Sequence, residues 1–331
     1  MIIVRTPTRV SFCGGGSDLP LFYKKHGGIV LSAGLSRYIY LSIHPYFYPD
    51  KLICKYSRNE LVDSYSELEH PIFRVLLEKF DLSGVEIVST ADVPAGTGLG
   101  SSSSFTVALL HILYAYTSKY VSPSRLAEEA CHTEIELLGE PIGKQDQYAA
   151  AFGGLNVYRF NKDGSVAVEP VILSPGAMDR MERSLMMFYT GDLRSASKIL
   201  LQQGINVVSD NEEEQAQLEI CKLTEELYKE LSSENVDALG EIMSANWEHK
   251  RKLVSGMTNP LIDKAYDTAM SAGATGGKLL GAGGGGFLLF YVPDHKQNAV
   301  KNALTHLRYM EFGLSLTGST VIYVGDKPKG L

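Results

Sequence analysis

The chain has 331 residues, of which 44% are hydrophobic, and 31 basic against 38 acidic side chains give a formal charge of −7. This length is sufficient for one large or two ordinary domains with a buried core. Without a basic stripe or a long apolar segment, we expect neither nucleic-acid nor membrane binding. The four cysteines lack metal-binding spacing and no signal peptide is evident, which predicts reduced thiols in a cytoplasmic protein.

The first half of the chain alternates short β-rich segments with turns before it becomes helical. Aromatic and β-branched residues bounded by Gly, Pro or Ser predict the strands, and apolar residues at helical spacing predict the helices. The predicted strands are Met1–Val4, Arg9–Phe12, Ile29–Ala33, Tyr38–His44, Lys51–Tyr56 and Val85–Ser89, with a hairpin of Leu155–Phe160 and Val166–Ile172. The predicted helices are Pro71–Phe80, Ser102–Ser118 and Ser122–Leu138.

The pattern loosens around Ser174–Glu182, so we expect a boundary there between lobes of residues 1–178 and 179–331. The second lobe is mostly helical. Mixed strands and helices of this kind predict an α+β protein in two lobes. The predicted strands are Leu185–Tyr189, Phe287–Val292 and Gly313–Val324, and the predicted helices cover 194–202, 211–232, 235–253, 260–272 and 295–308.

A glycine- and serine-rich segment, P-A-G-T-G-L-G-S-S-S-S at residues 94–104, stands between a predicted strand and a long predicted helix. Glycines let backbone N–H groups approach a ligand, and the helix N-terminus favours an anion. A simple helix cap is the alternative, but a cap needs only one serine. The segment therefore predicts a phosphate-binding loop, although it matches neither the Walker A nor the Rossmann pattern.

A second cluster, G-G-G-S-D at residues 14–18, follows a predicted strand and delivers Asp18. A carboxylate can accept hydrogen bonds from two neighbouring hydroxyls, which suits a sugar; a tight turn with an Asx cap is the alternative. A third cluster runs from Glu134 to Tyr148, where a helix end enters a Pro/Gly turn that holds Lys144 and Asp146. Taken alone, this cluster fits a surface helix terminus better than a functional site.

A fourth cluster has eight glycines within the fourteen residues 273–286 and precedes an apolar segment. Such density implies close backbone approach to a ligand or another segment. A flexible linker is the alternative, and the strand predicted directly behind the cluster argues against it.

Taken in their order along the chain, the four clusters resemble the motifs of the GHMP kinases. The segments G-G-G-S-D-L-P, P-I-G-K-Q-D-Q-Y-A-A-A-F-G-G and K-L-L-G-A-G-G-G-G-F are similar to one branch, the D-glycero-D-manno-heptose 7-phosphate kinases. The chain departs from galactokinase at residues 14–18, where that enzyme has G-E-H-T-D. The resemblance implies a ribosomal-S5-like N-terminal lobe and a ferredoxin-like C-terminal lobe, with ATP and substrate between them.

The resemblance also implies roles for individual residues. Asp146 matches the catalytic aspartate and Arg9 the basic residue that pairs with it, while Ser102 and Glu134 match the Mg²⁺ ligands. The implied ATP-binding residues are Pro94, Gly96, Gly98, Leu99, Gly100, Ser101, Ser102, Ser103 and Ser104. The implied substrate-binding residues are Gly15, Gly16, Ser17, Asp18, Gly281, Ala282, Gly283 and Gly284.

A sugar phosphate would also need positive partners for its phosphate group. Arg194 and Lys198 lie one turn apart on a predicted helix, and Lys144 neighbours the catalytic aspartate. A solvated helix pair explains Lys198 equally well, so Arg194 and Lys144 are the predicted substrate contacts.

The expected activity is ATP- and Mg²⁺-dependent phosphorylation of O1 of the heptose 7-phosphate to the 1,7-bisphosphate, which feeds the synthesis of nucleotide-activated heptose for surface polysaccharide. The alternatives are a kinase for an unphosphorylated sugar such as fucose or galactose, and a non-catalytic sugar sensor on the same fold. A sensor is expected to lose its catalytic groups, whereas Arg9, Glu134 and Asp146 are all present. The expected assembly is a monomer or homodimer.

Overall fold

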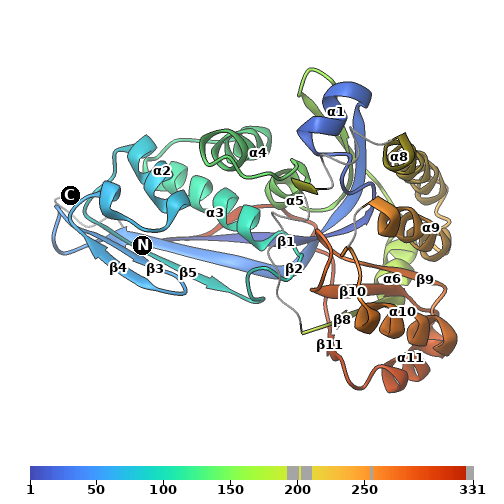
Figure 1. Ribbon diagram of the computed structural model, residues 1–331. Coiled ribbons are helices and arrows are strands. Elements are labelled where there is room, and N and C mark those ends of the chain that lie inside the picture. The colour runs from blue at the N-terminus through green and yellow to red at the C-terminus, as the bar shows by residue number, and fades with distance from the viewer. Residues whose placement is uncertain (192–200, 203–210, 254–255, 326–331) are drawn as a thin grey trace.

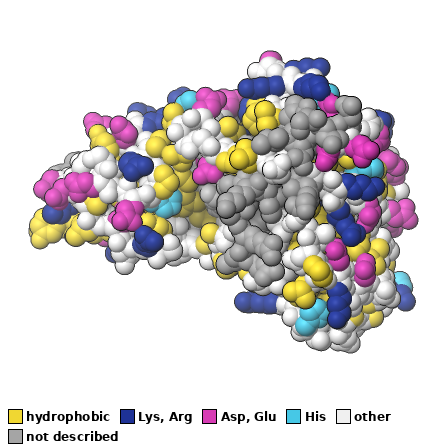
Figure 2. All heavy atoms as spheres, viewed as in Figure 1, with side chains coloured by type: hydrophobic (Ala, Val, Ile, Leu, Met, Phe, Trp, Pro, Cys, Tyr) yellow, Lys and Arg dark blue, Asp and Glu magenta, His cyan; other side chains and the backbone are white. Residues whose placement is uncertain are grey.

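The computed structural model consists of two lobes, each built around its own β-sheet (Figure 1). It describes residues 1–191, 201–202, 211–253 and 256–325. On the face shown in Figure 2, basic and acidic side chains are interspersed. Within the described part of the chain, no helix is both long enough and apolar enough to cross a membrane.

The N-terminal lobe contains a sheet of eight strands with helices α2 to α5 packed on one face (Figure 1). The strand order is β12-β1-β2-β5-β3-β4, and β6 and β7 extend the sheet beside β2. Strand and helix side chains between these layers form a core that includes Leu109 and Phe73. The strands are β1 Ile2–Cys13, β2 Gly28–Pro45, β3 Leu52–Lys55, β4 Asn59–Val62, β5 Val85–Ala91, β6 Leu155–Phe160, β7 Val166–Pro170 and β12 Thr320–Val324. The helices are α1 Pro20–His26, α2 Pro71–Phe80, α3 Ser101–Tyr116, α4 Pro123–Cys131 and α5 Gln145–Phe152, with a short 3-10 turn at Tyr65–Glu67.

The C-terminal lobe has a four-stranded antiparallel sheet in the order β11-β8-β10-β9. Its own core surrounds the buried Trp247. A further core joins the two lobes, because Phe12 and Leu31 pack in one cluster with Met187 and Leu289. The strands are β8 Leu185–Tyr189, β9 Gly276–Leu279, β10 Phe287–Tyr291 and β11 Arg308–Met310. The helices are α6 Pro175–Ser184, α8 Asn211–Ser232, α9 Ala238–Leu253, α10 Pro260–Ala272 and α11 Gln297–Ala303, the last preceded by a 3-10 turn at Asp294–Lys296.

Most predicted strands are present, but two pairs of them are fused. Met1–Val4 and Arg9–Phe12 are parts of one strand, β1, which continues through Pro7. The register against β2 shifts between Pro7 and Thr8, and such a bulge is where a sheet accommodates proline. In the same way, Ile29–Ala33 and Tyr38–His44 are both parts of β2.

Several helices differ from the prediction. The one expected over Ser122–Leu138 ends as an α-helix at Cys131 and continues as a π-helical turn over His132–Leu137. Helices α1, α5 and α6 were not predicted, because each is short and most carry Gly, Pro or consecutive alanines. The segment predicted as helix 295–308 is helical only to Ala303, and that predicted as strand Gly313–Val324 is a strand only from Thr320.

The end of the chain returns to the first sheet. Strand β12 pairs antiparallel with β1, and the registered pairs include Ile2 with Val324. The proposed division at residues 178 and 179 therefore leaves one strand of the N-terminal sheet in the second segment. The predicted helix over 194–202 lies outside the described residues except for its last two positions.

Candidate active site

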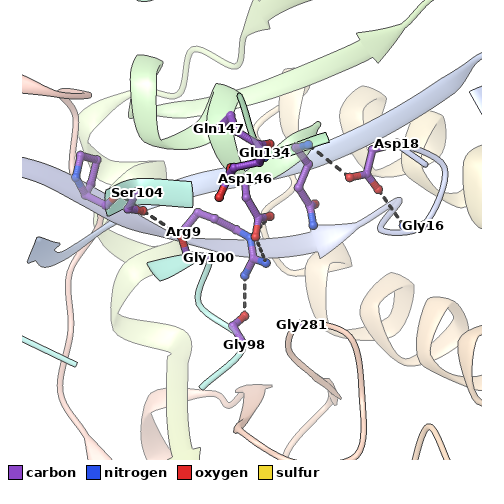
Figure 3. A network of polar contacts seen from close by, with 12 residues as sticks. Arg9, Gly16, Asp18, Gly98, Gly100, Ser104, Glu134, Asp146, Gln147 and Gly281 are labelled. Atoms are coloured by element: carbon purple, nitrogen blue, oxygen red, sulfur yellow. Dashed lines mark hydrogen bonds and ion pairs between the residues drawn. The ribbon is translucent and has the colours of Figure 1, made fainter. Parts of the chain in front are cut away.

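A cavity of about 460 Å³ lies between the two lobes and brings the four sequence clusters together. Figure 3 shows its polar network around Arg9, with Asp146 above the guanidinium and the loop of Gly281 beside it. The predicted residues that line the cavity are Arg9, Gly15, Gly16, Asp18, Gly96, Gly98, Gly100, Ser101, Ser102, Ser103, Glu134, Asp146, Gly281, Ala282 and Gly283.

The glycine-rich loop meets the fourth glycine cluster backbone to backbone. A Cβ on Gly281 would lie 2.6 Å from the Cα of Gly98, and a Cβ on Gly98 would lie 2.8 Å from the carbonyl oxygen of Leu280. Both glycines also have positive φ, 82° at Gly98 and 79° at Gly281. Any other residue would therefore be strained here and would push the loops apart. Helix α3 begins directly behind the loop, so its free N–H groups point toward the cavity.

Arg9 and Asp146 form a two-pronged ion pair at the centre of the site. Arg9 Nε donates to Oδ1 of Asp146 at 2.8 Å, and Nη2 donates to Oδ2 at 2.9 Å. Nη1 donates to the carbonyl oxygen of Gly98 at 2.5 Å, which connects the pair to the glycine-rich loop. Arg9 is only 3% exposed, whereas the Asp146 side chain is 24% exposed and reaches the cavity. Asp146 stands in the first turn of α5, so the structure corrects the predicted placement of this residue in a turn.

Asp18 lies at the other end of the network. Its Oδ1 accepts from Gly16 N–H at 3.0 Å and its Oδ2 from Gln145 N–H at 3.2 Å. Burial, together with the nearby charge of Asp146, raises the pKa of the Asp18 carboxyl. A Cβ on Gly143 would lie 1.9 Å from Asp18 Oδ2, so the P-I-G-K turn fits around this carboxyl only with glycine.

Glu134 projects into the cavity from the π-helical turn that follows α4. Such turns occur often at functional sites. Glu134 is only 2% exposed, accepts a hydrogen bond from Gln147 Nε2 at 2.6 Å, and is also hydrogen-bonded by Ser103 and Thr106. Burial nevertheless raises its pKa to about 7, and no cationic side chain among the described residues forms an ion pair with this carboxylate.

These properties fit a divalent cation. A bound Mg²⁺ would supply the missing positive charge, and carboxylate and hydroxyl oxygens are the ligands that it prefers. The hydroxyl of Ser102 is exposed on the cavity wall, next in sequence to Ser103. No group of three or more His, Cys, Asp or Glu side chains able to hold a metal occurs among the described residues. The site thus suits an ion that enters with nucleotide phosphates as its remaining ligands.

Some predicted residues do not line the cavity. Ser104 Oγ donates to backbone carbonyls, at 2.9 Å for Pro7, and Ser17 Oγ bonds the backbone of Ile29, so both hydroxyls serve the fold. The side chain of Leu99 is in the core between the lobes. Pro94 lines a different cavity, and the Gly284 N–H donates to Met257.

Lys144 also points elsewhere. Its Nζ donates to the carbonyl of Gly164 at 2.6 Å and lies 5.1 Å from the ring centre of Tyr23. We therefore do not retain Lys144 as a substrate contact. The predicted contact Arg194, like its neighbour Lys198, lies outside the described residues.

The cavity also contains residues that sequence reasoning did not select. Lys250 enters from α9, and His70, Pro71 and Ile72 line the cavity at the start of α2. The only sequence signal for Lys250 was a short basic run at 249–252, which is typical of a solvated helix end. His70 packs against Phe73 and Phe105, at ring-centre distances of 5.1 Å each, and the sequence pattern does not distinguish it from a core residue.

The fold and site define a two-lobed α+β protein with a glycine-rich loop at a helix N-terminus, a buried carboxylate suited to Mg²⁺ and an arginine–aspartate pair between the lobes. Two family models match the sequence: the GHMP kinases N terminal domain at residues 64–154 and the GHMP kinases C terminal domain at residues 225–308. Together they cover more than half of the chain. The protein belongs to the GHMP kinase family and is an ATP-dependent phosphotransferase of the predicted two-lobe fold.

Individual relatives span almost the whole chain. The sequence is 28% identical over 313 residues to a D-glycero-alpha-D-manno-heptose 7-phosphate kinase of Campylobacter jejuni, covering 91% of this chain and 92% of that protein. It is 27% identical to a bifunctional fucokinase/GDP-fucose pyrophosphorylase of Arabidopsis thaliana, over 88% of this chain and 30% of that longer protein. A crystal structure described as a D-glycero-D-manno-heptose 1-phosphate kinase from Bacteroides thetaiotaomicron superposes with a TM-score of 0.81 at 25% identity, covering 98% of this chain and 100% of that one.

Proposed function

We propose that this kinase phosphorylates O1 of D-glycero-D-manno-heptose 7-phosphate to give the 1,7-bisphosphate, with Mg²⁺ as the cofactor. One observation carries the proposal. Asp18, a carboxylate suited to sugar hydroxyls, lines the same cavity as the Arg9–Asp146 pair and the glycine-rich loop. The names of the Campylobacter and Bacteroides relatives support a heptose phosphate as the substrate. They differ in the position of the phosphate, so the position is part of the proposal.

Each group has a definite task in this reaction. Mg²⁺, when bound by Glu134 and Ser102, would neutralise charge on the nucleotide phosphates. The loop N–H groups and the α3 N-terminus would hold the phosphate oxygens, and Asp18 would accept hydrogen bonds from sugar hydroxyls. Asp146 would orient the O1 hydroxyl and accept its proton, while the two hydrogen bonds from the guanidinium of Arg9 hold this carboxylate in place.

A coupled ADP-release assay across a panel of sugars tests the proposal. The panel contains the heptose 7-phosphate, the free heptose, the heptose 1-phosphate, fucose and galactose. A charge-assisted hydrogen bond to phosphate is worth about 1.5–3 kcal/mol, so the 7-phosphate is expected to exceed the free heptose in kcat/KM by about 10-fold to 150-fold. Equal rates on these two sugars would refute a 7-phosphate specificity.

A second candidate is a kinase for an unphosphorylated sugar, and the match to the plant fucokinase favours fucose. Faster turnover of fucose or galactose than of any heptose phosphate would select it. A non-catalytic sugar sensor predicts sugar binding without ADP release from any member of the panel. The presence of Arg9, Asp146 and Glu134 in one cavity argues against the sensor.

A further inference from the structure

Lys250 brings a buried ammonium group from the C-terminal lobe into the cavity. It lies in the last turn of α9 and is 6% exposed. The helix is held tightly on β9, because a Cβ on Gly276 would lie 1.7 Å from the carbonyl oxygen of Gly240. Lys250 Nζ donates to the carbonyl of Gly281 at 2.9 Å. The backbone at Gly281 touches Gly98, whose carbonyl is bonded by Arg9, so Lys250 and Arg9 contact the two glycine loops where these meet.

The two cavity cations differ in how much of their charge is already matched. Arg9 is neutralised by Asp146 through two hydrogen bonds. Lys250 forms no ion pair with any described residue, and its hydrogen bond to the carbonyl of Gly281 occupies one of its three donors. The charges of Asp18 and Asp146 act on Lys250 from a distance, but no carboxylate contacts its ammonium group among the described residues. A buried cation without a directly bonded counter-charge is costly, and that cost is typical of groups that bind an anionic ligand.

The surroundings of Lys250 provide a second free donor. The open side of Gly15 faces both Lys250 Nζ and the hydroxyl of Ser11, since a Cβ there would lie 3.6 Å and 3.7 Å from them. The Ser11 hydroxyl is buried and has no hydrogen-bond partner among the residues that the structure describes. Burial and the charge of Arg9 lower the pKa of Lys250 to about 8, so it is mostly protonated at neutral pH.

We propose that Lys250 is a further catalytic residue of this kinase, whose ammonium group binds the phosphoryl group as it passes from ATP to the acceptor hydroxyl. The proposal rests on the phosphotransferase activity proposed above. In this step the bond between the γ-phosphorus and the β–γ bridging oxygen breaks, and a bond from the acceptor oxygen to the same phosphorus forms. ADP leaves with the electron pair of the broken bond, and the hydroxyl proton goes to Asp146. Negative charge on the phosphoryl oxygens is shared with Lys250, which approaches from the lobe opposite Arg9.

The test compares Lys250→Met with wild type and with Lys252→Met, which removes an exposed lysine two residues further along the same helix. Binding of ADP and Mg²⁺ is measured by calorimetry with and without aluminium fluoride, which mimics the phosphoryl group in transfer. Lys250→Met is expected to bind ADP with the affinity of wild type. Aluminium fluoride should increase the affinity for ADP about 10-fold to 150-fold less in Lys250→Met than in wild type, which corresponds to the loss of one charge-assisted hydrogen bond. Its kcat should fall by a similar factor with the sugar KM within about threefold of wild type, whereas Lys252→Met should match wild type.

The proposal would be overturned if aluminium fluoride increased the ADP affinity of Lys250→Met as much as that of wild type. It would also be overturned if the substitution changed only the sugar KM or only the affinity for ADP. Lys250→Gln, which keeps a polar side chain of similar length without the charge, gives the same test if the methionine variant does not fold. Circular dichroism melting of each variant verifies its fold. The binding arm needs no sugar, so it tests Lys250 even if every sugar in the panel fails. Failure of the whole panel with wild type would instead count against the proposed substrate.

Discussion

The polar network of the candidate site is organised around Arg9, which binds the catalytic candidate Asp146 on one side and the carbonyl of Gly98 in the glycine-rich loop on the other. A guanidinium holds a carboxylate through two parallel hydrogen bonds, and this fixes the position and orientation of the carboxylate. The pair thus connects the proposed proton acceptor, Asp146, to the proposed phosphate-binding loop through the carbonyl of Gly98. Asp146 remains open to the cavity while Arg9 is buried behind it.

Replacement of Asp146 by Asn is therefore expected to impair chemistry more than nucleotide binding. The amide keeps the shape of the side chain but cannot take a proton, so kcat should fall by about 10²-fold or more. ATP affinity should stay within about threefold, because the phosphate loop is unchanged. Steady-state kinetics and calorimetric ATP titration measure the two quantities. Turnover like that of wild type would remove Asp146 from the catalytic role.

Glu134→Gln tests the metal site in two ways. A neutral amide is a poorer ligand for a hard cation, so the Mg²⁺ concentration at half-maximal rate should rise. An unchanged Mg²⁺ titration would exclude Glu134 as a ligand. Thr133 offers no carboxylate at the neighbouring position, so Thr133→Ser serves as a control that leaves the Mg²⁺ dependence intact.

In the absence of Mg²⁺, the free energy of unfolding of Glu134→Gln is expected to depend on pH differently from that of wild type. The Glu134 pKa is about 7 in the folded protein and 4.5 when exposed. Between these values the folded state holds a proton that the unfolded state has released, so the free energy of unfolding falls as pH rises through this window, by about 3 kcal/mol. Gln does not titrate, and urea unfolding of Glu134→Gln at pH 5 and pH 8 should lack this decrease. Parallel profiles for the two proteins would contradict the shifted pKa.

At the level of elements, the site depends on contacts between loops from different lobes. The loop before α3 and the loop between β9 and β10 touch through Gly98 and Gly281, with no side chain between them. The turn before α5 closes on Asp18 through Gly143 in the same manner. Glycines at these positions are needed for space, and at Gly98 and Gly281 also for a positive φ.

Gly281→Ala is expected to separate the two loops. Its Cβ would lie 2.6 Å from backbone of Gly98, and backbone cannot move aside as a flexible side chain can. A displacement of about 1 Å at the phosphates can cost about 10²-fold, and we expect a loss of that order in kcat/KM for ATP. Gly176→Ala is the matched control, because a Cβ there meets nothing within 4 Å and the residue lies near the start of α6. Equal kcat/KM for the two variants would contradict the contact.

At the scale of the molecule, the two lobes are joined by a common hydrophobic core and by the last strand, which follows the C-terminal lobe in the chain but lies in the N-terminal sheet. Residues of β1 and β2 pack with residues of β8 and β10, and β12 carries the chain end back beside β1. The cavity is lined from both sides of this junction. We therefore expect the lobes to unfold as one cooperative unit.

Leu109→Ala tests this coupling. Leu109 is fully buried in the N-terminal core, so its truncation should lower the free energy of unfolding by about 2–5 kcal/mol. The only tryptophan, Trp247, is buried in the C-terminal core and reports on that lobe by fluorescence. Its urea midpoint should fall together with the far-ultraviolet circular dichroism signal. A Trp247 midpoint equal to that of wild type would show that the lobes unfold independently.

Local features of the protein follow from its sequence. Periodicity and turn residues predicted most strands and the long helices, and the resemblance of four sequence clusters to the GHMP kinase motifs predicted a kinase site with Arg9, Asp146, Asp18 and Glu134. Which of these residues face the cavity depends on how the two lobes pack. Ser104, Ser17 and Lys144 carry the polar groups that ligand-binding residues use, but their side chains donate hydrogen bonds to backbone carbonyls instead. Lys250 was overlooked because it becomes buried in the cavity wall only when α9 packs on β9. Burial of that kind is a property of the packed lobes that no local pattern encodes.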